Sequence, residues 1–187
     1  DNFNSTHPGF LAMYGMEWGI ISGGGHVVVH GNGLNSLFGW ESNVGGTAGQ
    51  NYDVFVAKND YSSLFSTINF FSGNNTFGSL AHPNLANTAY NSAADDAISA
   101  TAVESGPATS TNTTYSNPGS SMSYLWYYQT LLSRGYHLGP TIDHDNHNTT
   151  FGKTTFSRTA VVSASLAKAD MYNALRNMHF YATQDCD

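Results

Sequence analysis

The chain has 187 residues, of which 40% are hydrophobic and 10% charged, and its formal net charge is -7. This length indicates a single domain with a hydrophobic core, and the scarcity of Lys and Arg argues against binding to nucleic acid or to anionic membranes. The single cysteine, Cys186, excludes an internal disulfide framework, and no apolar run approaches the roughly 20 residues that span a bilayer.

The first half of the chain alternates strand and helix signals. Residues 26–30 contain three valines in the alternating pattern of a strand, and the glycines at 23–25 indicate a tight turn before it. Asp60 or a neighbouring serine is a suitable N-cap for a helix. We expect strands at 10–17, 26–30 and 80–82, helices at 64–71 and 93–100, and a Gly-rich loop at 43–51.

The second half begins with a long polar segment. Residues 105–121 are rich in Ser, Thr, Pro, Gly and Asn, which predicts a surface loop or a lid. The clearest helix follows at 122–134, where apolar residues recur at helical spacing before Gly135. Further strands are expected at 136–142, 159–163 and 180–183, with a helix at 166–177.

This alternation of elements predicts an α/β fold with a mainly parallel sheet. In such folds the chemistry gathers at the carboxyl ends of the strands. Glu17, His82 and residues 143–147 all follow or end a predicted strand, so we expect them at one edge of the sheet.

The segment Thr-Ile-Asp-His-Asp-Asn-His at 141–147 contains two carboxylates and two imidazoles. Carboxylate oxygen and imidazole nitrogen are the donors that bind zinc, iron or manganese, and an Asp-x-His pair such as Asp145 and His147 can direct two ligands at neighbouring ions. An exposed polar loop is the alternative. The density of donors favours a metal site.

Three upstream residues are further candidate ligands. Glu17 lies between Met16 and Trp18, where an unpaired carboxylate would be costly to bury. His26 begins the valine-rich strand, and His82 precedes Pro83, where it could instead cap a turn. The remaining histidines are interpreted as structural, including His30 on the same strand face as His26: His7, His30, His137 and His179.

Four motifs in order, Gly-Met-Glu at 15–17, Gly-His at 25–26, Ala-His-Pro at 81–83 and the closing Asp-x-His, resemble the PHP (polymerase and histidinol phosphatase) superfamily of metal-dependent hydrolases. The nearest branch is the one loosely called CehA/McbA-like. The resemblance covers almost the whole chain and implies a distorted (β/α)7 barrel, one domain over 1–187, with two or three divalent transition metal ions, Zn, Mn or Fe.

The resemblance also implies roles for individual residues. Glu17 would bridge two ions, His82 would be a ligand, and Asp145 and His147 would ligate different ions. His26 matches the Gly-His position, as a ligand or as an orienting group. The His-x-His that normally opens the superfamily has no counterpart, because only His7 precedes Glu17. We therefore expect a partial chain whose barrel is incomplete at the N-terminus.

Such a site predicts hydrolysis of phosphoester or related ester or amide bonds in a small-molecule substrate by a metal-activated water. Asp143 and His144 flank the expected ligands and are candidates for general acid–base catalysis or for orienting the imidazoles. The principal alternative is a secreted structural or adhesive subunit that keeps the barrel, lacks catalysis and self-associates. A carbohydrate-binding module with Trp and Tyr platforms is a third possibility.

The low charge and the abundance of Asn, Ser, Thr and Gly are typical of secreted proteins. We therefore expect a secreted, cell-surface or periplasmic location.

Overall fold

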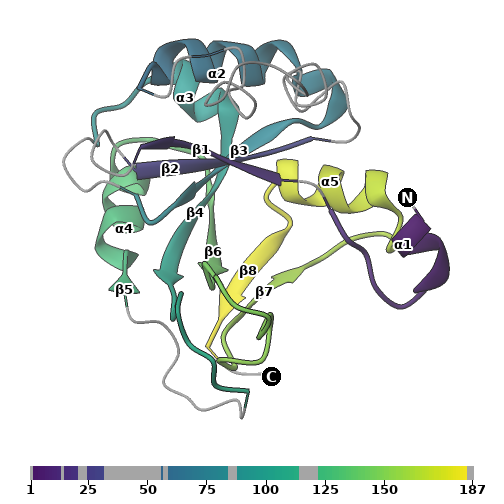
Figure 1. Cartoon of the computed structure of the whole chain (residues 1–187). Helices are drawn as coiled ribbons and strands as arrows, with labels where there is room; N and C mark the ends of the chain where they lie inside the picture. The colour runs from purple at the N-terminus through teal and green to yellow at the C-terminus, as the bar shows by residue number, and fades with distance from the viewer. Residues whose placement is uncertain are drawn as a thin grey trace, which may run out of the picture.

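The computed structural model describes residues 2–13, 15–20, 25–31, 56, 59–83, 88–113 and 122–184. The described strands form a six-stranded mixed sheet, in the order β1-β2-β3-β4-β5 with β6 also paired to β4, and a separate two-stranded sheet of β7 and β8 (Figure 1). The strands are β1 Gly15–Ile20, β2 Gly25–His30, β3 Phe77–Ala81, β4 Ile98–Ser105, β5 Met122–Ser123, β6 Gly139–Asp143, β7 Arg158–Val161 and β8 Phe180–Thr183.

The prediction of a (β/α)7 barrel with mainly parallel strands is wrong. Among the described strands, only β3–β4 and β4–β6 pair in parallel, whereas β1–β2, β2–β3, β4–β5 and β7–β8 are antiparallel. Only residues 21–24 connect β1 to β2, too few for the crossover that parallel strands need, so these strands form a hairpin. Over the described residues the large sheet runs from β1 to β5 without closing on itself.

Helices cover the sheet on both sides. The helices are α1 Asn2–Thr6, α2 Tyr61–Phe70, α3 Ser92–Ala97, α4 Leu125–Ser133 and α5 Lys168–Arg176, with a short 3-10 helix, η3, at Ser72–Asn74. Asp60 caps α2 as predicted, because its side chain accepts a hydrogen bond from the Ser63 amide. Figure 1 shows α2 and α3 together on one side of β1, β2 and β3.

The core lies between this helical layer and the sheet. Met16 and Trp18 on β1 and Val27 and Val29 on β2 are buried, and they belong to one cluster with residues of α2, α3 and α4. The residues between them along each strand point to the opposite face. Glu17 and His26 therefore lie on the side of the sheet away from α2.

Part of that second face is covered by α5. Phe77 at the start of β3 contacts the fully buried Tyr172 of α5, with ring centroids 6.4 Å apart. His30 stacks on Phe77 at a centroid distance of 5.0 Å, in agreement with its structural interpretation. The candidate site lies on the other half of this face, which carries His26.

Several predicted elements have different bounds. The first strand spans Gly15–Ile20 instead of 10–17, which places Glu17 in its middle and not at its end. The helix at 93–100 ends at Ala97, and the following residues form β4, the strand to which β3, β5 and β6 all pair. All of β4 except Glu104 is buried, so it has no polar alternation that would identify it as a strand.

The C-terminal elements agree more closely with the sequence. The strand at 180–183 has its predicted bounds, and those at 136–142 and 159–163 appear as β6 and β7. The helices at 166–177 and 122–134 appear as α5 and α4, although the latter starts at Leu125 because Met122–Ser123 pairs with β4. No helix in the described part is long and apolar enough to cross a membrane.

The predicted loop at 105–121 is described as far as residue 113, and the predicted loop at 43–51 and Cys186 lie outside the described residues. The described part of the former packs against the segment after β6. The Gly106 amide donates to the Asp143 carbonyl and the His147 amide to the Ala108 carbonyl, each at 2.9 Å. These bonds hold the Asp- and His-rich segment in place.

Candidate metal centre

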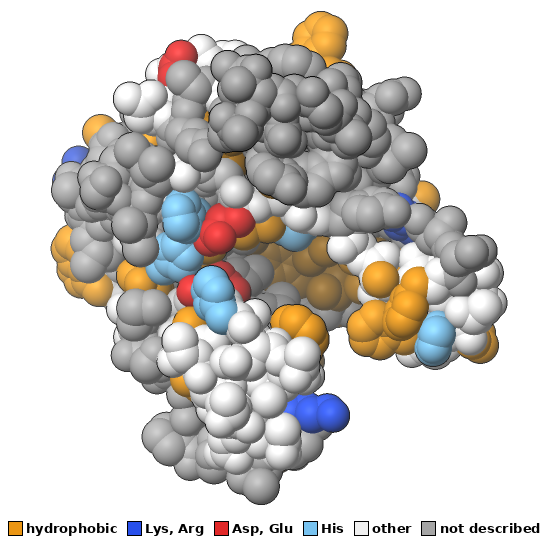
Figure 2. Space-filling view, in the orientation of Figure 1, with side chains coloured by type: hydrophobic (Ala, Val, Ile, Leu, Met, Phe, Trp, Pro, Cys, Tyr) orange, Lys and Arg blue, Asp and Glu red, His pale blue; other side chains and the backbone are white. Residues whose placement is uncertain are grey.

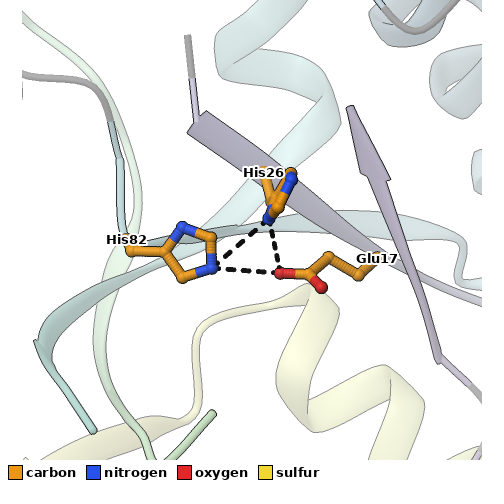
Figure 3. Close-up of side chains that lie close together, drawn as sticks. All are labelled: Glu17, His26 and His82. Carbon is orange, nitrogen blue, oxygen red and sulfur yellow. Dashed lines mark hydrogen bonds and ion pairs between the residues drawn. The ribbon is translucent and has the colours of Figure 1, made fainter. Parts of the chain in front are cut away.

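Glu17 on β1, His26 on β2 and His82, which directly follows β3, converge on one another (Figure 3). Glu17 Oε1 lies 2.8 Å from His26 Nδ1 and 3.0 Å from His82 Nε2, and the two nitrogens are 3.4 Å apart. One ligand atom from each residue lies within 4.8 Å of the other two. The three are called the Glu17 triad below.

The register of the hairpin brings Glu17 and His26 together. Glu17 pairs with Val28, and Gly19 pairs with His26, so Glu17 and His26 are diagonal neighbours on one face. Gly19 contributes no side chain between them. On the other side of β2, His26 pairs with Ala81, the last residue of β3.

His82 reaches the same face because the backbone leaves the strand conformation. Leu80 pairs with Val27 and faces the core, so strict alternation would direct the next-but-one side chain, His82, toward the core as well. The φ angle of His82 is 31°, in the left-handed region that a residue with a Cβ rarely adopts. This turn of the backbone directs the imidazole toward Glu17, and such conformations concentrate at functional sites.

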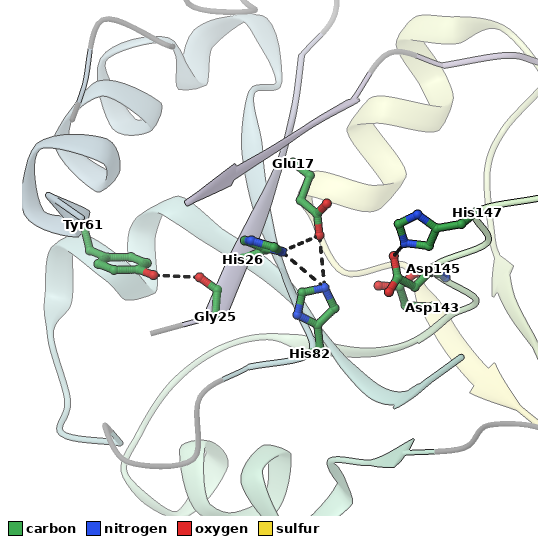
Figure 4. Close-up of polar contacts among 8 residues, drawn as sticks. All are labelled: Glu17, Gly25, His26, Tyr61, His82, Asp143, Asp145 and His147. Atoms are coloured by element: carbon green, nitrogen blue, oxygen red, sulfur yellow. Dashed lines mark hydrogen bonds and ion pairs between the residues drawn. The ribbon is translucent and has the colours of Figure 1, made fainter. Parts of the chain in front are cut away.

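Tyr61 fixes the start of β2 next to His26. Its hydroxyl donates to the Gly25 carbonyl at 2.6 Å (Figure 4), and its ring packs edge-on against Trp18 with centroids 5.1 Å apart. The main chain that carries His26 is thereby tied to α2. No motif around Tyr61 signals this role in the sequence.

The donors of the triad fit a divalent transition metal. Two imidazole nitrogens and one carboxylate oxygen are a ligand set of catalytic zinc sites, and donors around a tetrahedral zinc ion lie roughly 3.3 Å from one another. The distances between the three donor atoms, 2.8, 3.0 and 3.4 Å, lie close to this spacing. The Glu17 side chain is 42% exposed against 7% for His82, so the site is open to solvent on the Glu17 side.

The second ring nitrogen of His82 has a different environment. Nδ1 is buried, and it has no hydrogen-bond partner among the described residues. Ligating histidines usually donate from their other nitrogen to a carboxylate, a carbonyl or water. Nδ1 is buried and Nε2 points at Glu17. Within the described structure, this imidazole therefore makes its polar contact through Nε2, inside the triad.

Asp143, Asp145 and His147 form a second polar group beside the triad (Figure 4). Asp145 Oδ1 lies 3.2 Å from His147 Nε2, and the Asp145 amide donates to Asp143 Oδ1 at 3.0 Å. Asp145 has a φ angle of 47°, again in the left-handed region. Figure 2 shows histidine and acidic side chains side by side at the edge of a hollow on this face.

The electrostatic environment of Asp143 connects the two groups. Burial raises the pKa of its carboxyl group, and the hydrogen bond from the Asp145 amide opposes this shift. The charges of Asp145 and Glu17 raise the same pKa, and that of His82 lowers it. Asp143 is thus within electrostatic range of the triad.

The predicted site residues are therefore arranged in two groups. Glu17 and His82 converge as expected, and His26 joins them directly. Asp145 and His147 pair with each other, and the three-donor group found among the described residues includes neither. His144 is directed elsewhere, because its Nε2 lies 3.0 Å from the Ser157 carbonyl oxygen.

A pocket of about 420 Å³ adjoins the second group, and its walls include Asp143, His144, Asp145, Phe151, Arg158 and Thr159. Arg158 and Thr159 begin β7, and the Thr159 hydroxyl accepts a hydrogen bond from the Ile142 amide at 2.9 Å. This bond fixes β7 beside the end of β6. Neither residue could be assigned to the site from the sequence, because nothing in the sequence shows which loop faces the Asp- and His-rich segment.

Comparisons of the chain with models of known protein families, with curated proteins and with solved structures gave no match. The function of the chain is therefore inferred from the chemistry and geometry of its residues.

Proposed function

We propose that the protein is a metal-dependent hydrolase in which Glu17, His26 and His82 hold a divalent transition metal ion, Zn, Mn or Fe. The observation that carries the proposal is the convergence of three metal-binding atoms, from segments up to 65 residues apart, within 4.8 Å. The order of the four sequence motifs supports the same chemistry. The substrates are small molecules with phosphoester or related ester or amide bonds.

A bound ion would lower the pKa of a water ligand toward 7 and polarise the substrate oxygen. The chain supplies the rest of the chemistry. His82 is buried and fixed, whereas the exposed side of Glu17 leaves room for water and substrate to approach. Asp143 lines the pocket and lies near the triad, so it is placed to transfer a proton between the water and the leaving group.

Asp145 and His147 form a candidate second metal site in the same proposal. Two ions side by side would stabilise both the attacking and the leaving oxygen. The number of ions bound per chain tests this second site. One bound equivalent means that only the triad binds metal, whereas two equivalents mean that the Asp145–His147 pair binds an ion as well.

The test begins with protein stripped by a chelator and reloaded separately with Zn²⁺, Mn²⁺ or Fe²⁺. We expect at least one equivalent of one ion to bind and to restore chelator-sensitive hydrolysis of a 4-nitrophenyl phosphate or 4-nitrophenyl acetate probe. Glu17→Gln should abolish this activity. The matched control is Glu104→Gln, which changes a carboxylate on β4 that accepts a hydrogen bond from Gln184.

A protein that binds no ion and hydrolyses neither probe would contradict the proposal. That result would favour the alternative of a non-catalytic secreted or surface subunit, which the low charge and the abundance of Asn, Ser and Thr also support. Sedimentation of the same sample would then show whether the chain self-associates.

A further inference from the structure

The pocket that adjoins the second polar group contains charges of both signs. Asp143 and Asp145 line it together with Arg158. The chain has only six Lys and Arg residues, so a guanidinium in the wall of a pocket that also contains two candidate site carboxylates is a specific feature. The volume of about 420 Å³ falls within the roughly 300–1,000 Å³ typical of small-molecule sites.

Main-chain carbonyls fix the guanidinium of Arg158. One terminal nitrogen, Nη1, donates to the Ser157 carbonyl at 2.7 Å and to the Thr155 carbonyl, and Nη2 donates to the Gly152 carbonyl at 2.8 Å. These bonds orient the guanidinium in the wall of the pocket, and a planar guanidinium is well suited to carboxylate and phosphate groups.

Phe151 gives the pocket an apolar wall. Phe151 is 69% exposed, although three threonines of the same loop, Thr150, Thr154 and Thr155, are buried. An exposed ring at the rim of a pocket offers a surface to an apolar part of a ligand.

We infer that Arg158 binds an anionic oxygen group of the substrate, so that the preferred substrates are small esters or amides that carry a carboxylate or a phosphate group. The inference rests on the proposed function and specifies its substrate class. Repulsion from Asp143 and Asp145 directs the anionic group toward Arg158. The remainder of the substrate then extends past Phe151 and toward the carboxylates beside the triad.

The test measures ligand binding and hydrolysis separately. Phenylphosphonate, phenylacetate and the neutral benzyl alcohol are titrated calorimetrically into the full chain, both metal-free and zinc-loaded. We expect the two anions to bind more tightly than benzyl alcohol, and the tighter anion identifies the group that the pocket prefers. Arg158→Gln should weaken anion binding about ten- to a hundredfold in both forms, because a charged hydrogen bond is lost.

Two variants serve as controls for Arg158→Gln. Arg158→Lys keeps the charge and should weaken anion binding less, whereas Arg134→Gln removes an exposed charge at the end of α4 and should leave binding unchanged. If Arg158→Gln does not fold, Phe151→Ala decides instead. It should weaken phenylphosphonate at least about fivefold and leave methylphosphonate unaffected, since only the former has a ring to contact Phe151.

Equal binding of anions by wild-type and Arg158→Gln protein would overturn the inference, as would equal effects of Phe151→Ala on both phosphonates. Anion binding that depends on Arg158 without any metal-dependent hydrolysis would leave the pocket assignment standing and contradict the proposed function. Hydrolysis that depends on Glu17 but shows no preference for anionic esters would leave the proposed function standing and contradict the pocket assignment.

Discussion

A single oxygen of Glu17, Oε1, lies within 3.0 Å of a ring nitrogen of both His26 and His82, although the Glu17 side chain is 42% exposed. Partly exposed ion pairs contribute little to folding, typically about 0–1 kcal/mol. A cluster of this kind is therefore not explained by stability alone. The donor atoms that the cluster holds together point to a role in metal binding.

Glu17→Gln should therefore have almost no effect on the stability of the metal-free protein. We expect its free energy of unfolding in urea to change by less than about 1 kcal/mol, because solvent screens the lost charge. Zinc at a hundred times its dissociation constant should stabilise the wild-type protein by about 2.7 kcal/mol. The variant should lose most of this increment, and an equal zinc effect in both proteins would show that Glu17 is not a ligand.

The conformation of His82 gives a second prediction at the same scale. Glycine tolerates a φ angle of 31°, whereas any residue with a Cβ is strained there by roughly 1–2 kcal/mol. His82→Gly should therefore be more stable than His82→Ala by about 1 kcal/mol in the metal-free state, measured by urea denaturation. A more stable alanine variant would mean that His82 does not hold this conformation in solution.

The residue types of the site could be predicted from the sequence, but their grouping could not. The chemistry of Glu17, His26 and His82 identified them as candidate ligands. Their meeting depends on the β1–β2 register and on the φ angle of His82, neither of which is determined by nearby residues. For the same reason the separation of Asp145 and His147 from the triad was not foreseen.

At the scale of elements, packing between β6 and β8 determines where Asp143 lies. A Cβ placed on Gly139 would approach two ring carbons of Phe180 to 2.6 Å, and Phe180 is buried. Gly139 therefore permits β8 to approach the start of β6. The opposite end of β6 carries Asp143 and leads into the second polar group.

Gly139→Ala should lower the free energy of unfolding by about 1–3 kcal/mol, the usual effect of overpacking a buried contact. Gly73→Ala is the control, since a Cβ at Gly73 would meet nothing within 4 Å. Urea denaturation of both variants gives the comparison. Equal stabilities would indicate that β8 does not pack against Gly139 as described.

The helix α4 contributes a prediction for alkaline pH. Burial raises the pKa of the Tyr127 hydroxyl to about 12, from about 10 in the unfolded chain. A raised pKa contributes stability that is fully present below pH 10 and is lost as the pH rises toward 12. The contribution is on the order of 3 kcal/mol, which corresponds to this difference in pKa.

Tyr127→Phe should therefore reduce the loss of stability between pH 10 and 12, measured as the free energy of unfolding at each pH. Tyr181→Phe, which changes a half-exposed ring on β8, is the matched control. If both variants lose stability as steeply as the wild type over this range, Tyr127 is not buried in the folded state.

Comparing β2 and α2 with β4 shows which elements can be predicted from local sequence signals. The valine alternation of β2 and the Asp60 cap of α2 are local signals, and both elements form close to their predicted bounds. The strand β4 was missed because burial on both faces removes the polar alternation. The signal at 93–100 therefore merged a short helix with the first residues of β4.

At the scale of the whole molecule, the relative direction of the paired strands could not be predicted from the sequence. Strand and helix signals that alternate along the chain suggested parallel pairing, yet the short β1–β2 connection forms an antiparallel hairpin. This hairpin carries two members of the triad. The site therefore lies across the face of the sheet, between β1, β2 and the end of β3, and not at the carboxyl ends of parallel strands.

The central claim is that Glu17, His26 and His82 together hold a metal ion. Calorimetric titration of metal-free protein with Zn²⁺ tests it most directly, using wild-type, Glu17→Gln and His26→Ala proteins. The control is His137→Ala, which removes an exposed histidine that also lies 2.9 Å from a carboxylate, that of Asp95, away from the site.

We expect the wild type and His137→Ala each to bind at least one equivalent of zinc. In the two site variants the affinity should fall by more than the roughly 10–100-fold that loss of an outer-shell partner causes. Wild-type protein that binds no zinc, or site variants that bind it as tightly as His137→Ala, would contradict the account.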